Sequence, residues 1–142
     1  MSIAPNATHF WIEAGAMSGV PIRFQIEFPD ELAQFFDQAS RTANRLQVDV
    51  PGHGQHDCDF VFRGSDYGQW SGDIWRLSLP QGPAYAGNVL HFHRVGTAQP
   101  FVYHLVIASP GSAQVLEWNQ HSVTTGRTGL ASQPNGREFG SW

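Results

Sequence analysis

The chain has 142 residues, a length typical of a single domain, and 41% of its residues are hydrophobic, which is enough to form one core. Its formal net charge is −4, and all eight basic residues are arginine. Without lysine the chain cannot build a P-loop, a lysine Schiff base or a metal nuclease centre of the PD-(D/E)xK kind. Any contact with an anion or a base edge must use arginine, whose guanidinium is planar and bidentate.

The chain has one cysteine, Cys58, so it can form no internal disulfide. The N-terminus lacks the basic and apolar regions of a signal peptide, and no apolar run approaches the roughly 20 residues that span a membrane. We therefore expect a protein of the bacterial cytoplasm with no membrane partner. Cys58 stands in a segment that reads as a strand entering the core, which predicts a buried structural thiol.

In the first half of the chain, a short strand is expected at residues 8–13, followed by a Gly/Ala loop at 13–19. Residues 20–28 alternate between apolar and polar side chains, the period-2 pattern of a half-buried strand, and Pro29 ends this strand. Asp30 is expected to cap a short helix over residues 31–37. Two further strands are expected at residues 46–50 and 57–63.

In the second half, a strand is expected at residues 74–79, a hairpin at 88–95 and 101–108, and a short helix at 112–119. From His121 onward the chain is poor in apolar residues, and residues 121–142 read as a polar tail or linker. Seven short strands and two short helices predict a mainly-β fold, a seven-stranded β-pseudobarrel over residues 1–120. Barrel closure is the natural solution because it removes sheet edges.

The segment between Arg63 and Arg76 is polar and glycine-rich, and it carries three large aromatic residues, Tyr67, Trp70 and Trp75. Trp70 or Trp75 could cover an end of the barrel. If these tryptophans are exposed instead, the segment would suit two classes of ligand. Sugars stack on tryptophan, which makes a carbohydrate- or small-ligand-binding barrel one alternative. Base edges in a DNA major groove accept arginine at guanine and glutamine at adenine, and aspartate accepts from the cytosine amino group.

Histidine offers the best candidate metal ligands. His91 and His93 lie on one face of a predicted strand, and His104 lies across the hairpin. A cupin-like site would also need a carboxylate shortly after this pair, and the sequence has none there. If Val95 pairs with Phe101, His104 points to the opposite face. We therefore expect no metal and no cofactor, and we keep a cupin-like metal protein only as a further alternative. No nucleophile with a positioned base stands out, so we expect a non-catalytic domain.

The order of these parts resembles the B3-like DNA-binding (effector) domain of EcoRII/UbaLAI-type restriction endonucleases. Residues 19–29, followed by Leu32 and Phe35-Phe36, are similar to the second strand and first helix of that family. Residues 66–69, continuing through Asp73 to Arg76, resemble its C-arm. Residues 87–92 and 104–109 look like its last two strands.

The resemblance implies sequence-specific binding of double-stranded DNA in the major groove, with CCWGG as the first site to try and a nuclease in a separate C-terminal domain. The residues that it assigns to DNA contact are Met17, Ser18, Arg23 and Gln25 in the N-arm, and Arg63, Ser65, Tyr67, Gln69, Trp70, Asp73 and Arg76 in the C-arm. The chain departs from the family where Gln69, Trp70 and Ser71 stand in place of basic residues.

Overall fold

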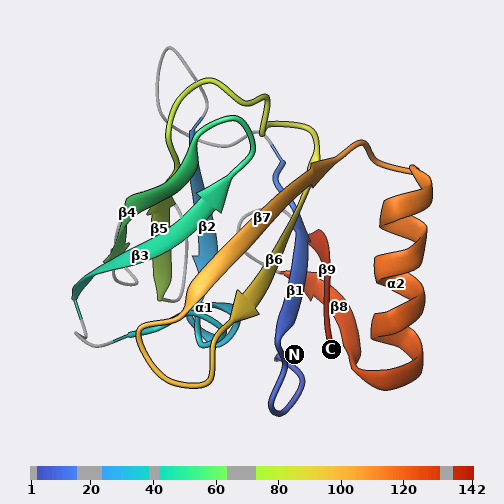
Figure 1. The fold of residues 1–142 in the computed structure, drawn as a ribbon. Helices are drawn as coiled ribbons and strands as arrows, with labels where there is room; N and C mark the ends of the chain where they lie inside the picture. The colour runs from blue at the N-terminus through green and yellow to red at the C-terminus, as the bar shows by residue number, and fades with distance from the viewer. Residues whose placement is uncertain (1–2, 16–23, 39–41, 64–72, 132–135) are drawn as a thin grey trace.

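The computed structural model describes residues 3–15, 24–38, 42–63, 73–131 and 136–142. They form a mainly-β fold in which one sheet curls into a nearly closed barrel, accompanied by two helices (Figure 1). The strands are β1 His9–Glu13, β2 Gln25–Pro29, β3 Ala43–Val50, β4 Gly54–Phe62, β5 Ile74–Ser78, β6 Val89–Val95, β7 Val102–Ala108, β8 Arg127–Ala131 and β9 Arg137–Ser141. The helices are α1 Asp30–Ala33 and α2 Ala113–Thr125.

The strands follow the spatial order β2-β5-β4-β3-β7-β6-β1-β9-β8. Neighbouring strands pair antiparallel except β3 and β7, which pair parallel. The two ends of the sheet are therefore β2 and β8. Arg137 of β9 reaches across the gap between them, because its guanidinium donates to the main-chain carbonyl of Glu27 in β2. Among the described residues no strand pairing joins β2 to β8, and the Arg137 side chain bridges the gap between these two edges.

The described residues contain nine strands rather than the seven expected, and the expectation of a polar tail from residue 121 is wrong. Helix α2 continues to Thr125, and β8 and β9 then form a hairpin that extends the sheet. Strand β9 pairs with β1, where Ser141 lies opposite Phe10. Phe139 is buried in the core and Ser141 is fully buried. Main-chain hydrogen bonds to β1 hold this segment, so a polar composition did not prevent strand formation.

The other expected strands and helices are present in the described residues, several with altered bounds, whereas residues 16–23, which hold most of the expected loop at 13–19 and the start of the expected strand at 20–28, lie outside them. Helix α1 is only four residues long, and Asp30 is its first residue, with Pro29 in the cap position and no capping side-chain bond. Strands β3 and β4 are longer than expected and form a continuous hairpin, in which Ala43 lies opposite Val61 and Val50 opposite Gly54. The first strand, the strand at 74–78 and the β6–β7 hairpin are confirmed.

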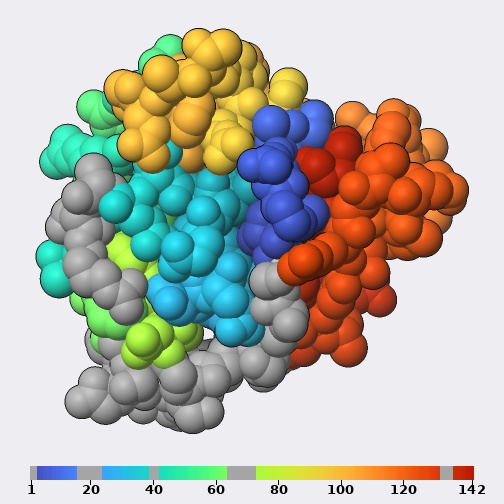
Figure 2. Space-filling model, turned by 90° about the horizontal axis from the view of Figure 1, so that it is seen from below, coloured from blue at the N-terminus to red at the C-terminus, as the bar shows by residue number. Residues whose placement is uncertain are grey.

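Aromatic side chains fill the barrel. The ring of Phe36, just after α1, lies within 6.1 Å of six others, measured between ring centroids: Phe10, Phe28, Phe35, Phe60, Phe92 and Tyr103. Figure 2 shows the end of the molecule where α1 and the residues after it, in cyan, occupy the centre of the surface. The short helix therefore plugs one end of the barrel, with Leu32 fully buried beneath it.

A second, smaller apolar layer lies between α2 and the outer face of the sheet (Figure 1). Its buried members are Trp11, Val89, Ala108 and Trp118. The Trp11 indole donates from Nε1 to Ser122 Oγ at 2.9 Å. Gly140 permits this approach, because a Cβ at that position would collide with both groups. Neither helix in the described residues is long and apolar enough to cross a membrane.

Candidate functional site

Seven of the predicted DNA-contacting residues lie outside the described residues: Met17, Ser18, Arg23, Ser65, Tyr67, Gln69 and Trp70. The structure places the other four on or beside the β2–β5 strand pair. Gln25 lies on β2 and Arg76 on β5, while Arg63 and Asp73 stand where residues 64–72 leave and rejoin the sheet.

Four polar side chains form a row on β2 and β5, which we name the β2–β5 face. Gln25 lies opposite Ser78, and its Nε2 donates to Ser78 Oγ at 3.3 Å. Glu27 lies opposite Arg76, and Arg76 Nη2 lies 3.1 Å from Glu27 Oε2. The side chains of this ion pair are only 14% and 10% exposed. Arg76 is thus held in place by Glu27.

The two predicted arms join the β2–β5 strand pair at opposite ends. At one end, the Leu79 amide donates to the carbonyl of Phe24, which lies between the N-arm residues Arg23 and Gln25 and is the first described residue after the gap at 16–23. At the other end, the Arg63 amide donates to the Ile74 carbonyl and the Asp30 amide donates to the Asp73 carbonyl. These two hydrogen bonds fix the residues on either side of the C-arm. Strands β2 and β5 have five residues each, so these ends are roughly 15 Å apart at about 3.3 Å per residue.

A buried guanidinium supports the β2–β5 face from behind. Arg137, which is 6% exposed, donates to the carbonyl of Glu27 and, at 3.3 Å, to the carbonyl of Glu13. Burial lowers the pKa of Arg137 to about 10, and the charges of Glu27 and Glu13 oppose that shift. The group therefore stays charged at neutral pH, and the backbone of β2 is tied to β1 and β9 beneath the polar row.

Trp75 belongs to the core. Its side chain is fully buried, it stacks on Phe60 with ring centroids 4.8 Å apart, and its Nε1 donates to Asp30 Oδ1 at 2.8 Å. The interpretation of Trp75 as an exposed aromatic of a binding loop is therefore wrong. The carbohydrate-binding alternative depended on two exposed tryptophans, and Trp75 is not available for stacking on a sugar. The other, Trp70, lies outside the described residues.

Strand register produces a second polar feature on the outer face, away from the β2–β5 pair. His9 of β1 lies opposite His93 of β6, His93 lies opposite His104 of β7, and His104 lies opposite Asp49 of β3. Val95 pairs with Val102. The expectation that His104 points to the face opposite His93 is therefore wrong, since it assumed a register shifted by one residue.

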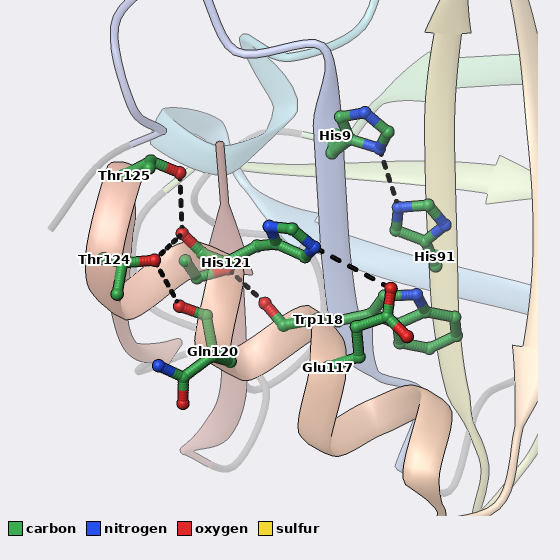
Figure 3. A network of polar contacts seen from close by, with 9 residues as sticks. His9, His91, Glu117, Trp118, Gln120, His121, Thr124 and Thr125 are labelled. Carbon is green, nitrogen blue, oxygen red and sulfur yellow. Dashed lines mark hydrogen bonds and ion pairs between the residues drawn. The ribbon is translucent and has the colours of Figure 1, made fainter.

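His9 is the centre of an aromatic cluster, and Figure 3 shows its His9, His91, Trp118 and His121 side chains. One face of its ring stacks on His93 and the other on Trp142, with centroids 4.1 Å and 4.4 Å apart and planes inclined by 7° and 5°. Its Nδ1 lies 3.1 Å from Nε2 of His91, within hydrogen-bond distance. His91 in turn stacks on Trp118 of α2 at 4.7 Å.

Helix α2 adds one more histidine to this cluster. The ring of His121 stacks on Trp142 with centroids 5.0 Å apart, and its Nε2 lies 3.8 Å from the Glu117 carboxylate one turn earlier (Figure 3). The cluster therefore joins β1, β6, α2 and the last described residue of the chain. His9, His121 and Trp142 were not among the residues predicted from the sequence, because only strand pairing and helix docking bring them together.

Burial lowers the pKa of the central histidines. The pKa of His9 falls to about 4, first through burial and then through the charges of His93 and His121. The pKa of His91 falls to about 3, through burial and the charges of His9 and His93. The pKa of His93 is lowered as well, by burial and by His104. At neutral pH these three imidazoles are therefore uncharged.

The pair His9–His91 is arranged to share a proton. The two ring centroids are 5.2 Å apart, the planes are inclined by 16°, and the facing nitrogens are 3.1 Å apart, so the rings meet edge to edge. Ligands of one zinc ion would instead converge on it at bonds of about 2.0–2.1 Å. In the described part of the chain no three or more His, Cys, Asp and Glu side chains could hold a metal ion.

No protein-family model matches the chain, and comparisons with curated proteins and with solved structures found no match.

Proposed function

We propose that this chain is a sequence-specific double-stranded DNA-binding module of the bacterial cytoplasm. It is the B3-like effector domain of a restriction endonuclease whose nuclease lies in a separate C-terminal domain, and it is not catalytic by itself. The observation that carries the proposal is the position of the β2–β5 face between the points where the two predicted arms join it. The separation of those points, roughly 15 Å, is close to the width of a DNA major groove, about 12 Å.

The side chains of this face divide into two roles. Gln25 carries an amide that can bond to adenine bidentately. Arg76 is engaged by Glu27, so it positions the face instead of reading a base freely. An Arg76→Ala change would leave the largely buried Glu27 carboxylate without this partner, and it would therefore lower stability as well as binding. Gln25 is the cleaner probe of base contact.

The net charge of −4 limits the number of phosphate contacts. Few guanidiniums are available, so affinity should depend only weakly on salt. A plot of the logarithm of the binding constant against the logarithm of the salt concentration should have a slope of about −2 to −3 for two or three phosphate contacts. Binding is measured by fluorescence anisotropy at low salt, with labelled CCWGG duplexes and scrambled duplexes of the same base composition. We expect at least tenfold tighter binding to CCWGG, whereas equal or absent binding to both duplexes contradicts recognition of this site.

A matched pair of substitutions tests the assigned face. Gln25→Ala should weaken binding to the cognate duplex by about 1–3 kcal/mol, the value of one good base contact. Gln114→Ala removes the same amide from an exposed position on α2 and should leave binding unchanged. Loss of cognate binding in both variants, or in neither, contradicts the assignment. Thermal melts of both proteins establish that they are folded.

A further inference from the structure

The histidine–tryptophan cluster beneath α2 lies apart from the β2–β5 face and has a separate consequence. We propose that the His9–His91 pair is a proton-operated latch: uptake of protons at this pair releases α2 from the outer face of the sheet while the barrel stays folded. The inference is independent of DNA binding. It rests on the geometry of the pair and on the small size of the apolar layer that α2 covers.

The pair accommodates one hydrogen between its facing nitrogens and no second one. In the neutral state one ring donates and the other accepts across the 3.1 Å gap. A charged His91 ring carries a hydrogen on both nitrogens, and its Nδ1 is buried and has no hydrogen-bond partner among the described residues. That charge would be neither hydrated nor paired, and an uncompensated buried charge is strongly disfavoured.

Protonation of His9 is disfavoured as well, because stacked rings cover it. Both faces of its ring are covered, by His93 and Trp142. The indole faces of Trp118 and Trp142 attract a cation, which offsets part of the cost, but an indole accepts no conventional hydrogen bond from the added proton.

The neighbouring titratable groups increase the cost of protonation. The charges of His93 on β6 and His121 on α2 lower the pKa of His9, and the charge of His93 also lowers the pKa of His91. Two carboxylates lie nearby, but both contact other histidines. Asp49 on β3 lies 3.3 Å from His104, and Glu117 on α2 lies 3.8 Å from His121.

Release of α2 is the least costly response. Only Trp118 and Ser122 of this helix are buried, and its apolar layer is separate from the phenylalanine core of the barrel. Undocking α2 removes Trp118 from the face of His91 and exposes that ring to water, where its pKa returns toward 6.5. Local opening of a weakly packed element, with the core intact, is a general property of folded proteins.

The sign of the effect follows from the lowered pKa values of His9 and His91. Docked α2 disfavours protonation, so docking is complete above about pH 6.5 and weakens as the pH falls below that value. If opening returns His91 to ordinary titration, the docking equilibrium should shift toward the open state by more than about tenfold between pH 7 and pH 5.

Hydrogen exchange on the full chain tests the latch. Protection factors of the amides in α2 and in β7, corrected for intrinsic exchange rates, are compared at pH 7 and pH 5. We expect protection in α2 to fall at least tenfold while that in β7 changes little. Equal protection of α2 at both pH values overturns the proposal, and so does a parallel loss in α2 and β7, because that would be global unfolding.

A double variant separates the pair from the other histidines. His9→Phe with His91→Phe keeps both rings and removes both titrations, so protection of α2 should become nearly independent of pH. His56→Phe, a matched change at an exposed position of β4, should retain the full pH response. Persistence of the response in the double variant overturns the latch. In the wild-type chain, NMR titration of the ring protons should place both midpoints below pH 5, and midpoints near 6.5 contradict the proposal equally.

Discussion

The guanidinium of Arg137 in β9 donates to the main-chain carbonyl of Glu27 in β2, and these two residues lie in the last strand but one and in the first strand of the sheet order. The barrel is therefore closed at this point by a buried side chain. The same Glu27 presents its carboxylate to Arg76 on the outer surface. One residue thus links the seam of the barrel to the face proposed to bind DNA.

Arg137→Met should lower the free energy of unfolding by about 2–4 kcal/mol. Two main-chain carbonyls lose a charged donor, and a buried hydrogen bond to a charged group is worth about 1.5–3 kcal/mol. Urea denaturation measures the change. Arg45→Met is the matched control, because Arg45 has a 71% exposed side chain in a surface ion pair with Asp59 and should change stability by less than about 1 kcal/mol. Equal effects of the two changes would show that Arg137 does not hold the seam.

Gly140→Ala should disturb the docking of α2. The added methyl group would collide with the Trp11 indole nitrogen and with Ser122 Oγ, which are hydrogen-bonded to each other. Overpacking of this kind costs about 1–3 kcal/mol, and the indole N–H resonance of Trp11 should shift. Gly52→Ala separates backbone strain from collision, because φ is +79° there and a methyl group added to Gly52 would meet no atom within 4 Å. It should cost only about 1–2 kcal/mol and leave the Trp11 resonance in place. An unshifted Trp11 resonance in Gly140→Ala would contradict the predicted collision.

The stability of the whole chain should fall in acid. The pKa of His91 is lowered to about 3 and that of His9 to about 4, so below pH 6.5 the unfolded state binds more protons than the folded state. At pH 5, His91 should account for a loss of about 2 kcal/mol relative to neutral pH, and the more exposed His9 for less. Urea denaturation at pH 7.5 and pH 5 measures this difference, and His91→Phe should reduce it. Identical unfolding free energies at the two pH values would contradict the assigned shifts.

Cys58 should be chemically inert in the folded protein. Burial, followed by the charges of Asp57 and Asp59, raises the pKa of its thiol to about 12, and the side chain is 1% exposed. Because the thiolate is the reactive form, modification by a disulfide reagent at pH 8 should be at least a hundredfold slower than in denaturant. Similar rates in the two conditions would show that Cys58 is accessible. The burial of this thiol agrees with the expectation from the strand pattern around it.

Local sequence pattern was sufficient to predict a mainly-β fold and most of its strands. The hairpin at β6 and β7 and the strand at β5 follow from short runs rich in apolar residues and bounded by turn residues. Absence of lysine and the single cysteine likewise restrict the chemistry without reference to any fold.

The same pattern could not reveal β8 and β9. Gly140 and Ser141 of β9 give no apolar signal, yet the strand is held by main-chain pairing with β1 and by Phe139 in the core. Trp75 was equally undecided, because an aromatic residue beside a polar loop can face the core or the solvent. Its bond to Asp30, 45 residues away, selects the core.

Local sequence therefore determined seven of the nine strands in the described residues, that Pro29 ends one of them and that chemistry based on lysine is excluded. Tertiary structure alone decided the register of the β6–β7 hairpin, the pairing of β9 with β1 and the docking of α2. Those three choices bring His9, His91 and His93 together and join Arg137 to Glu27. The physical reason is that register and edge pairing depend on contacts between residues far apart in the chain, whereas alternation depends only on neighbours.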